Sequence, residues 1–292
     1  MLNKILCVAV LGAVAGLAPA GAQSPTPPAA QPAAAAPGRI KGQIVAARVQ
    51  GHVTAVSKVN PDGRLLHDGD QVSEDSTVVT AGGASVILVF SNGATLDLAG
   101  DSRLKINEFE QDPFSTDLKA SDIKEEPGTS VTKLYLTKGE LVGRVAHLNV
   151  DKGSEFTVRD PVGAAGIRGT FFKHVFILLK HHKAHLSLET YEGLIQFTGL
   201  ASGPIDIAAG HKYEADLDYN PNDPDNPEDW PPPTTLILNG LFISPAEAAE
   251  FQLELQKFFS ALEGIVFPSG QPLPPPPPSP RLDQPTPGAG GP

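Results

Sequence analysis

The chain has 292 residues, a formal net charge of −11 and a single cysteine at position 7. The excess of acidic residues argues against a nucleic-acid-binding surface, because phosphate binding needs a clustered excess of Lys and Arg. One cysteine excludes a disulfide scaffold, a zinc finger and a CxxC redox pair. Gly and Pro contribute 29 residues each, a share that predicts linkers beside a folded core.

Residues 1–22 have the pattern of an export signal. Lys4 provides a positive start, an apolar run follows, and the small residues Ala20, Gly21 and Ala22 suit a cleavage site. The alternative is an uncleaved anchor, because the apolar run is uncharged and nearly long enough to span a bilayer. Its richness in Ala and Gly favours cleavage. We therefore expect a periplasmic or secreted protein, which contacts the membrane only if the segment is uncleaved.

Proline marks the expected domain boundaries. Residues 23–37 contain five Pro, residues 217–235 contain six Pro within a dense acidic run, and residues 268–292 contain eleven Pro. Such segments are typical of disordered or polyproline II linkers and tails. Residues 38–216 contain only five Pro and are predicted to form the folded domain.

The pattern of apolar residues within 38–216 predicts a mainly β domain. Apolar residues alternate with a period of two, as in 94–98, and short β-branched runs recur between Gly and Asn breaks. This spacing is typical of a sandwich, a barrel or a roll. Ser91, Asn92 and Gly93 separate two apolar runs and predict a type I′ hairpin turn. No helix is expected inside this domain.

Residues 236–267 are predicted to form a short strand, at 236–238, followed by an amphipathic helix over 245–263. Ser244 and Glu247 make a capping box, with Pro245 as the first helical residue. One apolar seam then steps by three and four residues, through Ala248, Phe251, Leu255, Phe258, Leu262 and Ile265. We expect this seam to dock on the β domain, because the helix is short for a free coiled coil; self-association is the alternative.

A family resemblance rests on one passage of the β domain. Glu155-Phe156-Thr157-Val158 and Pro161 lead into Ala165-Gly166-Ile167-Arg168-Gly169-Thr170 and Phe172. With this passage, residues 38–216 resemble the FecR domain of bacterial envelope proteins. The resemblance implies a β-roll, sandwich or solenoid-like exported domain that senses or contacts other proteins without catalysis. Asp160 departs from the usual Thr, and Phe171 stands where a polar residue is common.

The best-known FecR-type proteins also carry a cytoplasmic anti-sigma segment before a membrane helix. Only Met1 to Lys4 precede the apolar segment here. We therefore do not expect their transmembrane signalling role to apply, and make no link to iron or sigma-factor signalling.

The run from Gly163 to Thr170 is rich in small residues but lacks the Lys of a phosphate-binding loop. We interpret Gly166, Ile167, Arg168, Gly169 and Thr170 as a structural motif in which small residues allow close approach of backbones. Arg168 would need a carboxylate partner if this strand buries it.

Two sets of residues suggest metals at first sight. His174, His181, His182 and His185 lie around a predicted hairpin, but the flanking lysines Lys180 and Lys183 repel a cation, so a solvated hairpin tip is favoured over a metal site. The acidic segment 216–229 is rich in oxygen ligands suited to Ca²⁺. Pro221 and Pro227 stand where an EF-hand needs Gly and Glu. An irregular Ca²⁺ site therefore stays open beside a charged linker.

The catalytic motifs G-x-S-x-G and H-E-x-x-H are absent, and no catalytic residues are expected. The sequence predicts a non-enzymatic exported module that binds, senses or provides a scaffold in the cell envelope, with an envelope protein or polymer as partner. The alternative is an oligomeric, adhesin-like structural protein, in which the helix self-associates and Ca²⁺ stiffens the acidic segment.

Overall fold

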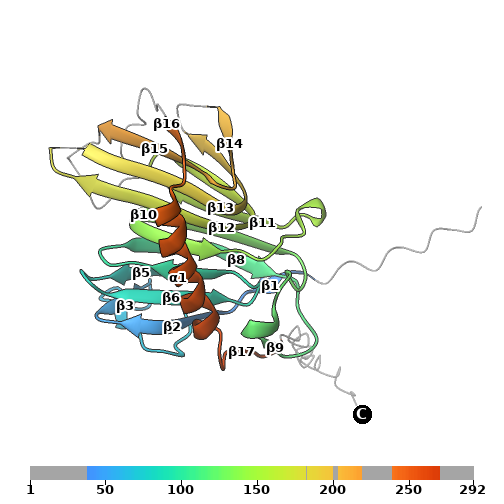
Figure 1. Cartoon of the computed structure of the whole chain (residues 1–292). Coiled ribbons are helices and arrows are strands. Elements are labelled where there is room, and N and C mark those ends of the chain that lie inside the picture. The colour runs from blue at the N-terminus through green and yellow to red at the C-terminus, as the bar shows by residue number, and fades with distance from the viewer. Residues whose placement is uncertain (1–37, 182, 200–202, 219–238, 270–292) are drawn as a thin grey trace, which may run out of the picture. The chain divides into compact units, whose positions relative to one another are not determined.

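The computed structural model describes residues 38–181, 183–199, 203–218 and 239–269. The predicted signal segment, the first linker and most of the two later proline-rich segments lie outside these ranges. The described part is mainly β with one α-helix near its C-terminal end, which confirms the predicted fold class (Figure 1).

The elements follow the chain in this order. The strands before the helix are β1 (Ile40–Lys41), β2 (Ile44–Gln50), β3 (Val53–Val56), β4 (Arg64–Leu65), β5 (Thr77–Thr80), β6 (Ser85–Phe90), β7 (Thr95–Leu98), β8 (Arg103–Gln111), β9 (Leu118–Lys119), β10 (Ser130–Arg144), β11 (Glu155–Asp160), β12 (Gly163–Leu179), β13 (Lys183–Gly199), β14 (Pro204–Ala208), β15 (His211–Asp218) and β16 (Asn239–Phe242). The helix α1 (Pro245–Ala261) and the short strand β17 (Val266–Phe267) follow. Two 3-10 turns, Ala120–Asp122 and Val150–Lys152, lie in the connections around β10.

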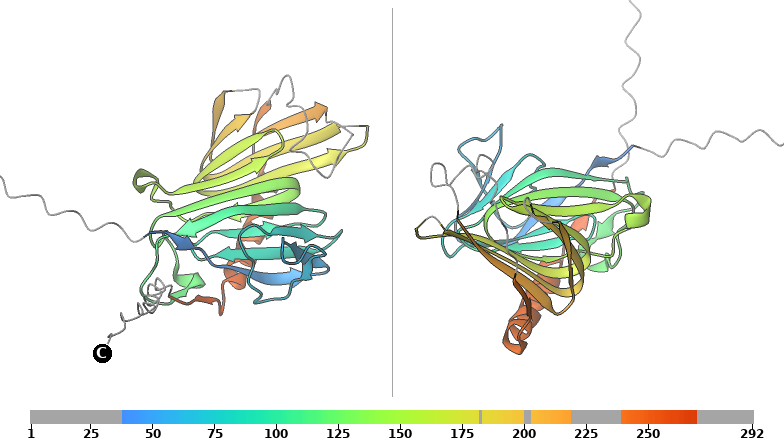
Figure 2. Two further views of the ribbon diagram at one scale, coloured as in Figure 1. Left: turned by 180° about the vertical axis from the view of Figure 1, so that it is seen from behind. Right: turned by 90° about the horizontal axis from the view of Figure 1, so that it is seen from above.

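The strands form two layers that share three long strands. Layer A has the order β16-β15-β13-β12-β10-β7-β6-β2, and layer B has the order β14-β13-β12-β11-β10-β8-β5-β3-β4, with β1 beside β8. β10, β12 and β13 contribute one half to each layer, as the changes in their pairing partners show. Figure 2 shows the sheet from behind and from above.

Glycines lie where the long strands pass from one layer to the other. β12 changes partners around Gly169, and β13 around Gly193, with φ angles of 58° and 79°. In β10 the change falls at Gly139, which also has a positive φ. Because a positive φ is unfavourable for residues with a Cβ, these bends depend on glycine.

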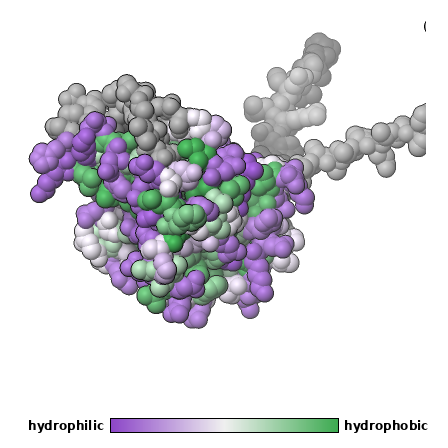
Figure 3. Space-filling view, turned by 45° about the horizontal axis from the view of Figure 1, so that its top comes forward, coloured by the Kyte–Doolittle hydropathy of each residue, from purple (hydrophilic) through white to green (hydrophobic). Residues whose placement is uncertain are grey.

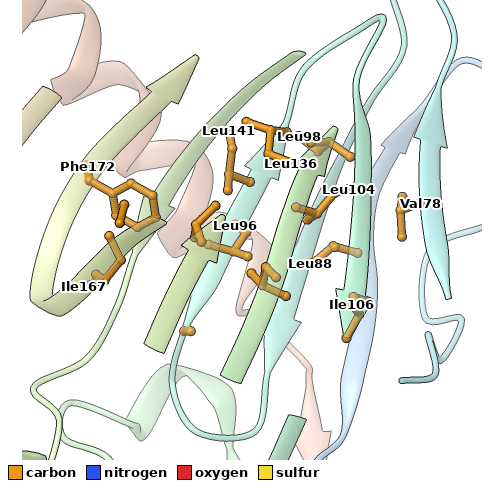
Figure 4. Packing of buried hydrophobic residues seen from close by; sticks show 14 of the residues in the cluster. Val78, Leu88, Leu96, Leu98, Leu104, Ile106, Leu136, Leu141, Ile167 and Phe172 are labelled. Atoms are coloured by element: carbon orange, nitrogen blue, oxygen red, sulfur yellow. The ribbon is translucent and has the colours of Figure 1, made fainter. Parts of the chain in front are cut away.

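The core lies between the two layers and is made of alternate residues of each strand. Leu88, Leu96 and Leu98 of layer A meet Leu104 and Ile106 of layer B (Figure 4). All five are at most 1% exposed. The alternation that predicted strands therefore also selects the face that each strand buries.

The prediction of a type I′ hairpin turn at residues 91–93 is wrong. Only Gly93 has a positive φ, and its N–H donates to the carbonyl oxygen of Phe90 at 3.0 Å. The loop is therefore a three-residue connection closed by a left-handed glycine. Asn92 points inward, where its Nδ2 donates to Ser130 Oγ and Thr132 Oγ1.

The predicted C-terminal helix is present and docks on the β layers. Its capping box forms on both sides, between Ser244 and Glu247, and it ends at Ala261 rather than at 263. Phe251, Phe258 and Leu262 are buried against apolar residues of layer A. The strand predicted at 236–238 lies outside the described residues. Within the described ranges no helix is long and apolar enough to cross a membrane.

Candidate functional site

The outer face of layer A is covered by α1, which crosses its strands (Figures 1 and 2). At one end of the helix, Lys212 Nζ lies 2.7 Å from Glu247 Oε1 and 2.9 Å from Glu214 Oε1. Hydrogen bonds, first from Lys212 and then from Ser244, lower the pKa of Glu247 to about 2. At the other end, Val266 and Phe267 of β17 pair with β9. The helix is thus tied down at both ends.

Aromatic rings fill the contact in the first half of the helix. Phe251 stacks on Tyr191 with ring centroids 3.7 Å apart, and meets the edge of Phe171 at 5.7 Å. Arg144 lies between the rings of Phe171 and Phe259, at 5.7 and 6.0 Å from their centroids. Burial lowers the pKa of Arg144, while the nearby Glu192 opposes this. Cation–π contacts therefore supplement the apolar seam.

Two adjacent phenylalanines allow a matched test of this docking. Phe258 is fully buried, whereas Phe259 is 57% exposed. We expect Phe258→Ala to lower the free energy of unfolding by about 3–5 kcal/mol, because it leaves a cavity beneath the helix. Phe259→Ala should cost less than about 1 kcal/mol, the scale of an exposed cation–π contact. Urea denaturation of both variants checks this, and equal losses would contradict the docked arrangement.

A half-buried carboxylate lies under the second half of α1. Asp97 of β7 lines a cavity of about 160 Å³ with Arg48, Lys257 and Ser260, among others. Its Oδ1 has no hydrogen-bond partner within the described residues. Burial raises the pKa of Asp97 to about 6, and the charge of Glu254 on the helix adds to this. The contact between helix and sheet thus holds a carboxyl group that resists ionisation.

This carboxyl group makes stability depend on pH. The pKa of Asp97 is raised in the folded state from 3.8 to about 6, so the folded protein binds the proton more tightly than the unfolded chain does. Stability should therefore fall as pH rises from about 4 to about 7, by at most about 3 kcal/mol from this group. Asp97→Asn should remove that fall and stabilise the protein at pH 7.

Urea denaturation between pH 4 and pH 8 measures this dependence. Glu254→Gln should reduce the fall without abolishing it, because burial, the larger cause, remains. A fall of the same size in Asp97→Asn and in the unsubstituted protein would show that Asp97 is not its source.

The outer face of layer B is not covered by the helix. In the view from behind, α1 lies on the far side of the strands (Figure 2, left). Outward residues of layer B are mostly half-buried or exposed, whereas Ile87, Val89 and Val142 on the outer face of layer A are buried. We call this outer side of β5, β8, β10 and β11 the open face.

Four cations gather on the open face, beside the ion pair of Lys133 with Glu108. Arg103 of β8 stands directly opposite Lys138 of β10, and Lys105 and Arg159 flank Tyr135 from the strands on either side. Within the described residues, none of these four cations takes part in an ion pair. We call Arg103, Lys105, Lys138 and Arg159 the basic band. It was missed in the sequence because its members come from three strands.

The structural motif proposed from the sequence lies at the bend of β12. Ile167 and Thr170 are 2% and 1% exposed, and Gly169 has a positive φ. Arg168 points outward and is exposed, with no ion pair among the described residues. Because Arg168 is not buried, it does not need the carboxylate partner that burial would require. Gly166, which precedes Ile167, pairs with Gln196 of β13.

The histidines are not brought together. His174 is fully buried, with its Nε2 2.8 Å from Asp160 Oδ2, whereas His185 Nδ1 lies 2.8 Å from Asp216 at the surface. His181 is in the turn after β12, and His182 lies outside the described residues. The described ranges hold no group of three or more His, Cys, Asp or Glu residues that could bind a metal. Most of the acidic segment 216–229 also lies outside them.

Exposed apolar side chains form a third surface feature. Four of them lie at the end of the β12–β13 hairpin and on the edge strand β16, and others are scattered over the described residues: Ile177, Leu179, Leu241 and Phe242, then Val59, Leu65, Val150, Leu253, Phe259 and Val266. On the side shown in Figure 3, hydrophobic residues form small patches between hydrophilic ones. Dispersed apolar residues of this kind are normal on a protein surface, so we base no site on them.

Comparison with known families identifies the central part of the two layers. The family model described as FecR protein matches residues 76–196, from β5 to β13. These residues are a FecR domain. The resemblance found in the sequence is thereby confirmed. The FecR residues include every strand of the open face, and the flanking strands β2, β3, β14 and β15 extend their sheet.

Solved structures add a distant likeness. Two crystal structures of an anti-sigma factor, described as putative, from Parabacteroides distasonis ATCC 8503 share 12% and 11% sequence identity with the chain, each with a TM-score of 0.38. The matches cover 62% and 60% of this chain, and 64% and 63% of those chains, so the chain spans less than two thirds of either. No curated protein matches the sequence significantly.

Proposed function

We propose that the chain is an exported, non-enzymatic FecR-type module that binds a partner in the bacterial cell envelope and acts there as a sensor or scaffold. One observation carries this proposal: the FecR strands are sealed by α1 on one side and left open on the other, charged side. A covered face and an open face suit a domain that presents one surface to a partner. The export-signal pattern of residues 1–22 supports the envelope as its location.

Cell fractionation tests export. The full chain, expressed in a Gram-negative host, should be recovered from the periplasm or medium with its N-terminus after residue 22. A chain without residues 1–22 should stay in the cytoplasm. Recovery of the intact full chain in the cytoplasm would contradict export, and recovery in the membrane with residues 1–22 retained would show an anchor instead.

Retention by an envelope preparation tests binding. Purified mature chain should sediment with washed envelopes, and replacing the four residues of the basic band by Gln should reduce this. Absence of any retention of the unsubstituted chain would contradict the proposal. The adhesin-like alternative relied on self-association through the helix seam, but Phe251 and Phe258 are used inside the same chain.

A further inference from the structure

The arrangement of the basic band on the open face favours the binding of an anion. Arg103 and Lys138 occupy directly opposed positions on neighbouring antiparallel strands. Like charges in such positions destabilise a sheet, because their Cβ atoms are only about 5 Å apart. Lys173 and Lys212 have a carboxylate within 3.0 Å, whereas the four cations of the band form no ion pair among the described residues. Single unpaired cations such as Arg168 occur elsewhere, but in the band four of them lie on one face of the sheet, two of them in directly opposed positions.

The geometry of the band points to a linear ligand that crosses the strands. Lys105, Tyr135 and Arg159 form one row over three adjacent strands, so the two cations are two strand spacings apart, about 10 Å. Along the strands, the next row of the open face holds the ion pair of Lys133 with Glu108, and the carboxylates of Glu110 and Glu155 lie beyond it. A polyanion running along the strands would meet these carboxylates. One running across them meets only the band.

The spacing of the positive charges in the basic band and the side chains beside it indicate which kind of polymer fits. Duplex DNA carries one charge about every 1.7 Å, which four cations bordered by carboxylates cannot match. A cation spacing of about 10 Å suits a polymer with sparse charges. Thr77 and Thr198 lie on the same face, in the row of Lys105 and Arg159, and offer hydroxyl groups to a hydroxylated chain.

We propose that the basic band of the FecR domain binds a linear acidic polysaccharide of the cell envelope, whose carboxylates pair with Arg103, Lys105, Lys138 and Arg159 while its hydroxyl groups meet the threonines of the open face. This inference rests on the proposed function, because it names the ligand of the same open face. The polymer lies across β8, β10 and β11. Its binding relieves the repulsion between Arg103 and Lys138.

Binding of polygalacturonate, a linear carboxylated polysaccharide, to the full chain at low salt is the test. Gln at all four band positions should weaken binding at least about tenfold, since each exposed ionic contact contributes up to about 1 kcal/mol. The matched control replaces four exposed lysines away from the band, Lys119, Lys124, Lys152 and Lys180, by Gln. It removes the same charge and should change binding less than about twofold.

Two further polymers complete the experiment. Neutral dextran should not bind, and polyphosphate should bind more weakly than polygalacturonate. Failure to bind polygalacturonate, equal losses in band and control variants, or tighter binding of polyphosphate would each overturn the inference. Undiminished retention of the band variant by envelopes would also overturn it, but leave the proposed function standing. If envelopes did not retain the unsubstituted chain, the proposed function itself would be overturned.

Discussion

Asp160→Ala is expected to lower the free energy of unfolding by about 3–5 kcal/mol. Asp160 ends β11, and its side chain is completely buried. Oδ1 accepts hydrogen bonds from the backbone N–H groups of Val162 and Gly163, at 2.7 and 2.8 Å, and Oδ2 faces His174. The alanine leaves two N–H groups and one ring nitrogen without partners in the core, and each such loss is costly.

The control for this substitution is Asp160→Asn. Its amide oxygen still accepts from Val162 and Gly163, and its NH₂ group still reaches the ring of His174. We expect a loss of only about 1–2 kcal/mol, the range for weakening a buried hydrogen bond. Thermal and urea denaturation compare the two. A loss below about 1 kcal/mol in Asp160→Ala would contradict the structural role of this pair.

Gly193→Ala is expected to cost about 3 kcal/mol or more. Gly193 lies at the bend of β13 with a φ of 79°, where an alanine is strained by about 1–2 kcal/mol. An added Cβ would also lie only 2.3 Å from the carbonyl oxygen of Gly169 and 2.8 Å from Thr170 Cγ2. Those atoms belong to the bend of β12, so the two strands must move apart, which adds the cost of overpacking.

Gly210→Ala separates backbone strain from this contact. Gly210 has nearly the same φ, 81°, but an added Cβ would meet nothing within 4 Å. It should therefore cost only about 1–2 kcal/mol, from strain alone. Denaturation of both variants measures the difference. Equal losses would show that close contact between the bends of β12 and β13 is not needed for the fold.

The sequence by itself determined the local elements. A period of two predicted strands because alternate side chains of a strand face opposite sides of a sheet. Ser244, Pro245 and Glu247 predicted the start of α1 because these residues satisfy the free N–H groups of the first turn. The passage from Phe156 to Phe172 identified the FecR domain, which the family match confirms. These signals all lie within short stretches of chain.

The local sequence pattern does not predict every feature, even within a single turn or strand. Asn92 was expected to adopt a left-handed conformation in a type I′ turn, but its side chain is held by Ser130 and Thr132, about forty residues away. His174 and Asp160 are fourteen residues apart on different strands, and no local pattern connects them. Asp160 precedes Pro161, a turn-forming context that could have indicated that its side chain binds backbone N–H groups there.

Only the tertiary structure decided how the three long strands divide between two layers and which outer face remains open. Both outcomes depend on pairings between distant segments, such as Arg103 with Lys138 or Gly139 with Phe176. Because side chains alternate along a strand, Arg168 and Ile167 must point to opposite sides of the sheet, but the alternation does not show which side faces the core. Packing decides this: Ile167 fills the space between the layers, and the guanidinium of Arg168 is left in water because a charge is costly to bury.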